Sequence, residues 1–383
     1  MVRQNGATAA LDPPLAVLDL AALDHNAADL VRRAGGTPIR VATKSVRCRW
    51  VLENVLSRQG FSGLMSYSLR EACWLVRAGF RDVLIGYPSA DRAALRELGS
   101  DPALLAEITL MVDDVNQLRY LADAVPEPAA PIRLCLDVDA SLRIGPVHLG
   151  VRRSPVRTPA AAAALAAAAS DSKRFVVVGL MFYEAQIAGL PDTSPAVALV
   201  KRRSADELAV RRTEVVEAVR AAGAGLEFVN SGGTGSIEIS AADNCVTEVS
   251  AGSGLYSPTL FDGYRQFRGQ PALLFALPVV RRPATRIATV FSGGYLASGP
   301  AKKSRLPTPV DRRLSLIGTE GAGEVQTPVR GRAARSLRIG DRVWFRHAKA
   351  GELLERFDQL QVVDGAAIVR TVPSYRGEGK NFG

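Results

Sequence analysis

The first two thirds of the chain alternate between short, continuously apolar segments and longer amphipathic ones. Strands are predicted at 38–43, 63–66, 82–86, 107–112, 131–137, 175–180, 226–229 and 246–249. Helices are predicted between them at 47–58, 68–78, 90–99, 114–124, 158–170 and 204–222. Apolar runs without alternation are typical of strands buried on both faces, as in parallel sheets. Eight of them separated by helices predict a closed (β/α)8 TIM barrel. A dinucleotide-binding sheet is disfavoured because no early Gly-x-Gly-x-x-Gly turn is present.

After about residue 265 the pattern changes to strand-like segments broken by Gly and Pro, at 272–280, 285–291, 340–346 and 360–364. This pattern predicts a second, β-rich domain. The expected organisation is a disordered N-terminal arm at 1–13, a barrel domain at 14–265 and a C-terminal β-domain with its tail at 266–383. The strand at 14–20 precedes the eight barrel strands, so we expect it to pair with the β-domain.

Composition narrows the class of protein. The formal charge is +10, but the basic residues form dispersed doublets without interleaved aromatics, so nucleic acid is not an expected partner. The four cysteines are scattered and lack Cys-x-x-Cys spacing, which favours a reducing compartment. No apolar stretch approaches the ~20 residues needed to span a bilayer, and the N-terminus lacks a signal-peptide core. A cytoplasmic enzyme without membrane contact is expected.

Lys44 directly follows the first predicted barrel strand, in a chain that uses lysine sparingly. A desolvated lysine amine can lose its proton and attack a carbonyl, which arginine cannot do. Active sites of such barrels form at the C-terminal ends of the strands. Lys44 is therefore a candidate to hold an aldehyde cofactor as a Schiff base. The structural alternative is a lysine whose stem lies along the strand edge with its ammonium in water.

Two glycine-rich turns follow the seventh and eighth predicted strands, where these barrels bind phosphate. The first contains Ser231, Gly232, Gly233, Thr234 and Gly235, and the second contains Gly254 and Tyr256. Glycines allow a ligand to approach the backbone closely, and successive N–H groups with nearby hydroxyls bind oxyanions. The position of both turns predicts a phosphorylated ligand, although either turn alone is more often a plain loop.

Polar residues also follow the fifth and sixth predicted strands. Arg143 belongs to the segment 137–143, and Tyr183 belongs to 182–186. An arginine in such a site can hydrogen-bond a pyridine nitrogen and keep it unprotonated. Alternatively, Arg143 pairs with Asp137 or Asp139.

In order and spacing, these residues resemble the alanine-racemase-type fold of pyridoxal-phosphate enzymes, and more closely its D-threonine aldolase and D-serine dehydratase branch. The resemblance covers about 13–370 and includes the entry segment from Pro14 to Asn26. It implies pyridoxal 5'-phosphate held by Lys44, Arg143 near the ring nitrogen, and Ser231–Gly235 with Gly254 and Tyr256 around the phosphate. It also implies a homodimer and a small amino-acid substrate.

The chain departs from this branch at the expected metal site. Metal-dependent members carry His-x-Asp or His-x-Cys in the β-domain, whereas here His347 is followed by Lys349. An ammonium has no lone pair to offer a metal, so a divalent metal is doubtful. We hypothesise that Lys349 replaces the ion and holds a β-hydroxyl or a second carboxylate. The alternatives are a Lys349–Glu352 pair, or a metal bound by His347 with Glu352 or Asp358.

The sequence therefore predicts a pyridoxal-phosphate-dependent lyase that acts on a D-configured or β-hydroxy amino acid by retro-aldol cleavage or by dehydration. The predicted catalytic residues are Lys44, Tyr183, His347 and Lys349. The alternatives are an amino-acid racemase on the same scaffold and a non-catalytic carrier of the cofactor. The carrier is disfavoured because such proteins are usually a barrel alone.

Overall fold

A computed structural model describes residues 2–192 and 194–383. It divides into two compact units, each discontinuous in sequence. The barrel unit comprises Leu30–Thr43, Leu56–Ala251 and Phe382–Gly383. The sheet unit comprises the residues up to Asp29 together with Lys44–Val55 and Gly252–Asn381.

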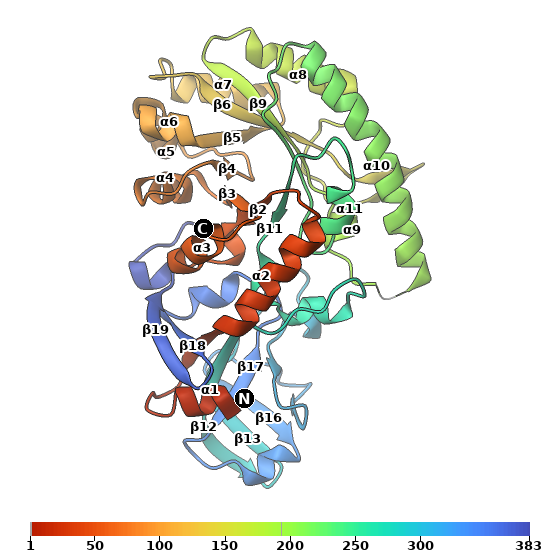
Figure 1. Cartoon of the computed structure of the whole chain (residues 1–383). Coiled ribbons are helices and arrows are strands. Elements are labelled where there is room, and N and C mark those ends of the chain that lie inside the picture. The colour runs from red at the N-terminus through yellow and green to blue at the C-terminus, as the bar shows by residue number, and fades with distance from the viewer. Residues whose placement is uncertain (1, 193) are drawn as a thin grey trace. The chain divides into compact units, whose positions relative to one another are not determined.

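The barrel unit contains a closed barrel in the order β10-β11-β2-β3-β4-β5-β6-β9 (Figure 1). Its parallel strands are β2 (Ile39–Ala42), β3 (Phe61–Ser66), β4 (Val83–Ile85), β5 (Ile108–Val112), β6 (Ile132–Val138), β9 (Phe175–Phe182), β10 (Phe228–Ser231) and β11 (Glu248–Ala251). The predicted TIM barrel is confirmed, and every predicted barrel strand overlaps an observed one. Burial on both faces explains why strands such as β4, whose three residues are all buried, read as short apolar runs.

The barrel helices are α4 (Leu69–Arg77), α5 (Arg92–Ser100), α6 (Pro102–Glu107), α7 (Val115–Ala124), α8 (Pro159–Ser170), α9 (Ala185–Ala188), α10 (Pro195–Ala221) and α11 (Ile237–Ala241). Ser194 caps α10 by accepting from the Val197 N–H, and Pro195 follows at its first position. The helix therefore begins nine residues before the predicted position 204, because cap and proline together form a helix start. Helices α8 and α10 pack side by side outside the barrel (Figure 1).

Two features of the barrel strands hold the barrel closed. Gly179 of β9 leaves room for the ring of Phe228 on β10, which a Cβ at Gly179 would approach to 2.2 Å. At the N-terminal ends of the strands, the buried Arg40 guanidinium donates to Glu248 at 2.7 Å and to Asp82 at 2.9 Å. Because active sites of this fold lie at the opposite end, the Arg40 cluster is structural.

The sheet unit contains a nine-stranded sheet within the described residues, built along β15-β16-β13-β12-β1-β18-β19, with β17 pairing β12 and β14. Its strands are β1 (Leu15–Asp19), β12 (Leu273–Ala284), β13 (Ile287–Phe291), β14 (Thr308–Pro309), β15 (Leu314–Leu316), β16 (Gln326–Gly331), β17 (Arg342–Arg346), β18 (Gln359–Asp364) and β19 (Ala367–Pro373). The predicted β-rich second part of the fold is confirmed. Strand β1 lies between β12 and β18.

The sheet unit also holds α1 (Val2–Ala7), α2 (Leu20–Ala34) as far as Asp29, α3 (Arg49–Leu56) as far as Val55, and α12 (Ser253–Tyr256). The expectation of a disordered arm at 1–13 is corrected for its described residues, because helix α1 contacts strand β17. Trp344 Nε1 donates to Asn5 Oδ1 at 2.6 Å, and Arg342 donates to the Thr8 hydroxyl at 2.6 Å. In the part of the chain that is described, no helix is both long and apolar enough to cross a membrane.

Candidate active site

The C-terminal ends of β6 and β9 form a small pocket in the barrel unit. Its lining residues are Asp137, Val138, Asp139, Ala140, Val151, Arg153, Ser154, Met181 and Tyr183. The predicted Tyr183 follows β9 directly, and its ring lies beside Gly233, where an added Cβ would stand 3.7 Å from Tyr183 Cε2. Two of the predicted site residues, from the sixth and seventh strand ends, are therefore adjacent.

Asp137 has the most perturbed carboxyl of this pocket. Its side chain keeps some accessible surface, but the surrounding protein removes most of its hydration, and the carboxylate of Asp113 lies nearby. Desolvation and this like charge raise the pKa of Asp137 to about 7, against the opposing effect of Arg153. Burial also raises the pKa of Asp113, which follows β5. The rim thus carries two carboxyls that resist ionisation, as acid–base sites often do.

Arg153 extends over two tyrosine rings at the same rim. Its guanidinium carbon lies 5.2 Å from the ring centroid of Tyr183 and 5.5 Å from that of Tyr87, which follows β4. Both distances are within the range of cation–π attraction. Neither Arg153 nor Tyr87 was predicted from the sequence, although Tyr87 directly follows a predicted strand.

The predicted Arg143 lies on a hairpin formed by β7 (Leu142–Ile144) and β8 (Val147–Leu149), opposite His148. Its guanidinium donates to Asp139 Oδ2 at 2.7 Å, so the predicted alternative of an ion pair is the arrangement found. Burial alone would raise the pKa of Asp139, but donors from Ser141 and Arg143 lower it below its usual value.

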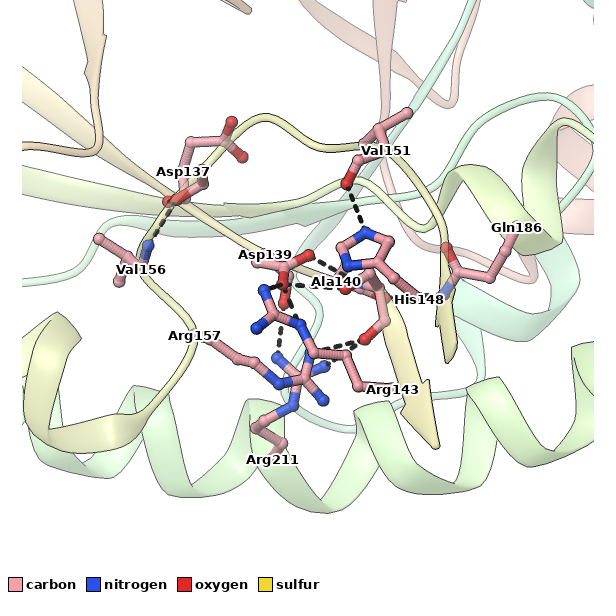
Figure 2. A network of polar contacts seen from close by, with 12 residues as sticks. Asp137, Asp139, Ala140, Arg143, His148, Val151, Val156, Arg157, Gln186 and Arg211 are labelled. Carbon is pink, nitrogen blue, oxygen red and sulfur yellow. Dashed lines mark hydrogen bonds and ion pairs between the residues drawn. The ribbon is translucent and has the colours of Figure 1, made fainter. Parts of the chain in front are cut away.

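Two further arginines surround Asp139 (Figure 2). Arg157 Nη1 lies 3.5 Å from Asp139 Oδ2, and Arg211 donates to the Asp139 carbonyl at 2.6 Å. Glu207 of α10 accepts from both arginines. This cluster fixes the hairpin to α10. The pKa of Arg157 is lowered by burial and by the neighbouring Arg211.

The predicted phosphate turn after β10 encloses a buried carboxylate that the sequence analysis missed. Glu184 Oε2 accepts from the Ser231 hydroxyl at 2.9 Å and from the Gly232 N–H at 3.1 Å. Glu184 Oε1 accepts from the Ser236 hydroxyl at 2.9 Å and from the Ser240 hydroxyl. Ser231 is fully buried and directed at Glu184, so its hydroxyl shapes the turn from within. The one sequence signal for this structural role was the position of an acidic residue, Glu184, directly after Tyr183.

The same turn has little room for side chains on its glycines. Gly232 has a φ of +93°, which favours glycine, and a Cβ at Gly233 would stand 3.0 Å from Ala188 Cβ. The Thr234 carbonyl accepts from Arg33 at 2.6 Å. Such a backbone allows close approach of an anionic group to the turn.

In the sheet unit, Lys44 lies in a one-turn 3-10 helix (Thr43–Ser45) that follows β2, and its side chain is exposed. Gly351, with φ +107°, packs against its backbone, and a Cβ there would stand 2.1 Å from the Lys44 carbonyl oxygen. Arg47 donates to that same carbonyl at 3.2 Å and pairs with Glu355. The Lys44 turn is therefore adjacent to the segment that follows His347 and Lys349.

Lys349 is half-buried and donates to the Ser298 hydroxyl at 3.2 Å. The backbone N–H of Ser298 donates to Glu352 Oε2 at 2.5 Å, so both charged side chains contact Ser298. His347 is buried, and neither ring nitrogen has a hydrogen-bond partner among the described residues. Burial and the adjacent Arg346 lower the pKa of His347 to about 3, so it is neutral at neutral pH.

The predicted Tyr256, on α12 beside Gly254, is fully buried. Its hydroxyl donates to the Val46 carbonyl at 2.8 Å, two residues beyond Lys44. Burial raises the pKa of Tyr256 well above its usual range. In this structure the tyrosine supports the Lys44 turn, and its role as a phosphate ligand stays a prediction.

The residues present fit pyridoxal phosphate. In the sheet unit, the exposed Lys44 amine follows β2. In the barrel unit, the turn after β10 leaves little room for a Cβ at Gly232 and Gly233, so a ligand group can approach its backbone. Within the described residues, no group of three or more His, Cys, Asp and Glu side chains is gathered to hold a metal.

Comparison with known proteins places the chain in a family. A model of the alanine racemase N-terminal domain matches residues 18–259, and the chain belongs to this family. It is 28% identical to a D-threonine aldolase from Arthrobacter sp over 72% of the chain and 70% of the relative. It is 25% identical to a 3-hydroxy-D-aspartate aldolase from Paracoccus denitrificans, over 63% of the chain and 60% of that relative's length.

Solved structures show the same fold. D-threonine aldolase from Filomicrobium marinum superposes with a TM-score of 0.81 at 21% identity, covering 94% of both chains. D-threo-3-hydroxyaspartate dehydratase from Delftia sp. HT23 gives 0.74 at 20% identity, covering 95% of this chain and 97% of that one. The predicted resemblance is confirmed, and the relatives agree with the predicted enzyme class, a pyridoxal-phosphate-dependent lyase.

Proposed function

We propose that this protein is a pyridoxal-phosphate-dependent lyase that cleaves or dehydrates a D-configured β-hydroxy amino acid. The observation that carries the proposal is Lys44, an exposed amine directly after β2 in a chain of the alanine racemase family. Pyridoxal phosphate, bound through its aldehyde, supplies a ring that takes up negative charge from the substrate α-carbon. The turn after β10, shaped by Glu184, would hold the phosphate through the backbone of Gly233 and Thr234.

The side chains of this protein supply proton transfer. For retro-aldol cleavage, a base takes the β-hydroxyl proton, the Cα–Cβ bond breaks, an aldehyde leaves, and the α-carbon is reprotonated. For dehydration, Lys44 Nζ takes the α-proton, hydroxide leaves from the β-carbon, and ammonia is released later. Tyr183 is the candidate base for the hydroxyl proton, since it borders the pocket at the end of β9.

We assign to the Lys349 ammonium the role that a divalent ion has in metal-dependent aldolases, namely holding the substrate β-hydroxyl. Lys349 lies two residues before Gly351, which packs against the Lys44 backbone, and this position supports the assignment. Activity should survive exhaustive chelation and should fall at least tenfold in Lys349→Met. The exposed Lys302 provides the control, Lys302→Met. Loss of activity on chelation that Mn²⁺ or Zn²⁺ restores would contradict the assignment.

Product analysis tests the reaction. Purified protein loaded with pyridoxal phosphate is given the D and L forms of threonine, serine and 3-hydroxyaspartate. Release of an aldehyde with glycine indicates an aldolase, whereas release of ammonia with a keto acid indicates a dehydratase. Exchange of the α-proton in D₂O with inversion and no cleavage indicates a racemase and overturns the proposal. Lys173→Ala, at an exposed lysine, is the control for Lys44→Ala.

A further inference from the structure

We propose that Arg153 binds a carboxylate of the substrate at the rim pocket formed by the ends of β6 and β9. This inference rests on the proposed function and names the residue that holds a carboxylate of the amino-acid substrate. All residues of this site belong to the barrel unit.

Arg153 differs from the arginines near it because its donors are unused. Arg143, Arg157 and Arg211 donate to Asp139, Glu207 and backbone carbonyls. For Arg153, no hydrogen bond or ion pair is formed with any residue in the described part of the chain. Its guanidinium instead lies over the rings of Tyr87 and Tyr183. Stacking fixes the plane of a guanidinium and leaves its edge, with a fork of N–H groups, open to a carboxylate.

The surroundings of Arg153 also fit an incoming anion. It lines the pocket together with Asp137, Ser154 and Tyr183. Asp137 is the nearby acid, but desolvation and Asp113 disfavour its charged form. In Figure 2 its carboxyl points away from the Asp139 cluster. Arg153 therefore carries positive charge that the neighbouring carboxyl only partly offsets, at the end of the barrel where substrates of this fold bind.

The carboxylate that Arg153 binds could be the one on the substrate α-carbon or one on the substrate side chain. Kinetic measurements distinguish these two cases. We expect Arg153→Met to raise KM by about 10- to 100-fold, the value of a lost charged hydrogen-bond pair, with a smaller change in kcat. If the increase occurs for 3-hydroxyaspartate and not for threonine, Arg153 binds the side-chain carboxylate. If it occurs for both, Arg153 binds the α-carboxylate. Arg153→Lys should give an intermediate KM, and Arg152→Met is the control.

A binding measurement that needs no turnover separates this inference from the proposed function. Titration calorimetry with succinate as probe should show binding to the wild type and to Arg152→Met, and at least tenfold weaker binding to Arg153→Met. Unchanged succinate binding and unchanged KM in Arg153→Met overturn the inference. A variant that loses affinity for pyridoxal phosphate and not for succinate also overturns it, because Arg153 then serves the cofactor phosphate. If neither the wild type nor any variant reacts with a hydroxy amino acid, the proposed function fails. Succinate binding that depends on Arg153 would still support the carboxylate site.

Discussion

Single residues at the barrel rim have properties set by what surrounds them. Asp137 and Asp139 are two positions apart on one strand end, yet the pKa of the first is raised and that of the second is lowered. The difference arises because Asp139 accepts from Ser141 and Arg143, whereas Asp137 is desolvated beside Asp113. The sequence shows the two carboxyls but not their different environments.

The raised pKa of Asp137 gives a pH dependence of stability. The folded state binds a proton on Asp137 up to about pH 7, whereas the unfolded chain releases it near its ordinary value of 3.8. The contribution of protonated Asp137 to the free energy of unfolding is therefore lost as the pH rises from about 4 to 7. Asp113, Asp139 and Arg153 are the charged groups around it. Asp137→Asn should raise the melting temperature more at pH 8 than at pH 5. An equal change at both pH values would contradict this account.

Gly351 gives a second prediction at the residue scale. Any side chain there would collide with the Lys44 carbonyl oxygen, 2.1 Å from the added Cβ. Gly351→Ala should displace the Lys44 turn and reduce covalent labelling of Lys44 by pyridoxal phosphate and borohydride. Gly340→Ala is the matched control, since Gly340 also has positive φ (+91°) but nothing within 4 Å of its added Cβ. Equal labelling in both variants would show that the contact does not position Lys44.

At the scale of elements, the strands were predictable and several connections were not. Strands buried on both faces are continuous apolar runs, which the sequence displays directly. The hairpin β7–β8 was missed because its strands are three residues long and only one of their six residues is buried. Glu184 was missed because its partners, from Ser231 to Ser240, lie 47 or more residues further along the chain. Contacts between distant strand ends depend on barrel closure, which local patterns do not encode.

Glu184 holds the turn after β10 through four donors, so its charge should matter. Glu184→Gln keeps the shape of the side chain but replaces one carboxylate oxygen with an NH₂ group. That group donates and does not accept, so it would face the hydroxyl and N–H donors that now bind the carboxylate. We expect unfolding free energy to fall by about 2–4 kcal/mol and affinity for pyridoxal phosphate to weaken. Glu214→Gln, at an exposed position of α10, should change stability by less than about 0.5 kcal/mol. Denaturant unfolding with and without cofactor measures both effects.

The Arg40 cluster at the opposite end of the barrel should affect stability alone. Arg40→Met leaves the Glu248 carboxylate, 11% exposed, without its guanidinium. Breaking such a pair costs about 3–5 kcal/mol. Arg133→Met removes the more exposed pair with Glu227 and should cost about 0–1 kcal/mol. A loss of catalytic rate in Arg40→Met under conditions where it is fully folded would contradict a purely structural role.

For the whole molecule, the sequence predicted the barrel and the β-rich sheet, but not how the chain is shared between them. Lys44–Val55, in the middle of the predicted barrel domain, belongs to the sheet unit. The reason is physical: backbone contacts from Arg47 to Tyr375 and from Lys44 to Gly351 join this segment to residues far along the chain. The homodimer stays a prediction, and light scattering after size-exclusion chromatography measures it.

The central claim is that Lys44 holds pyridoxal phosphate. The most direct measurement is borohydride reduction of the protein supplied with pyridoxal phosphate, followed by digestion and mass spectrometry. The account predicts one pyridoxyl group on the peptide that contains Lys44, unchanged in Lys173→Ala and lost in Lys44→Ala. Absence of labelling in the wild type, or a label on another lysine that persists in Lys44→Ala, would contradict it.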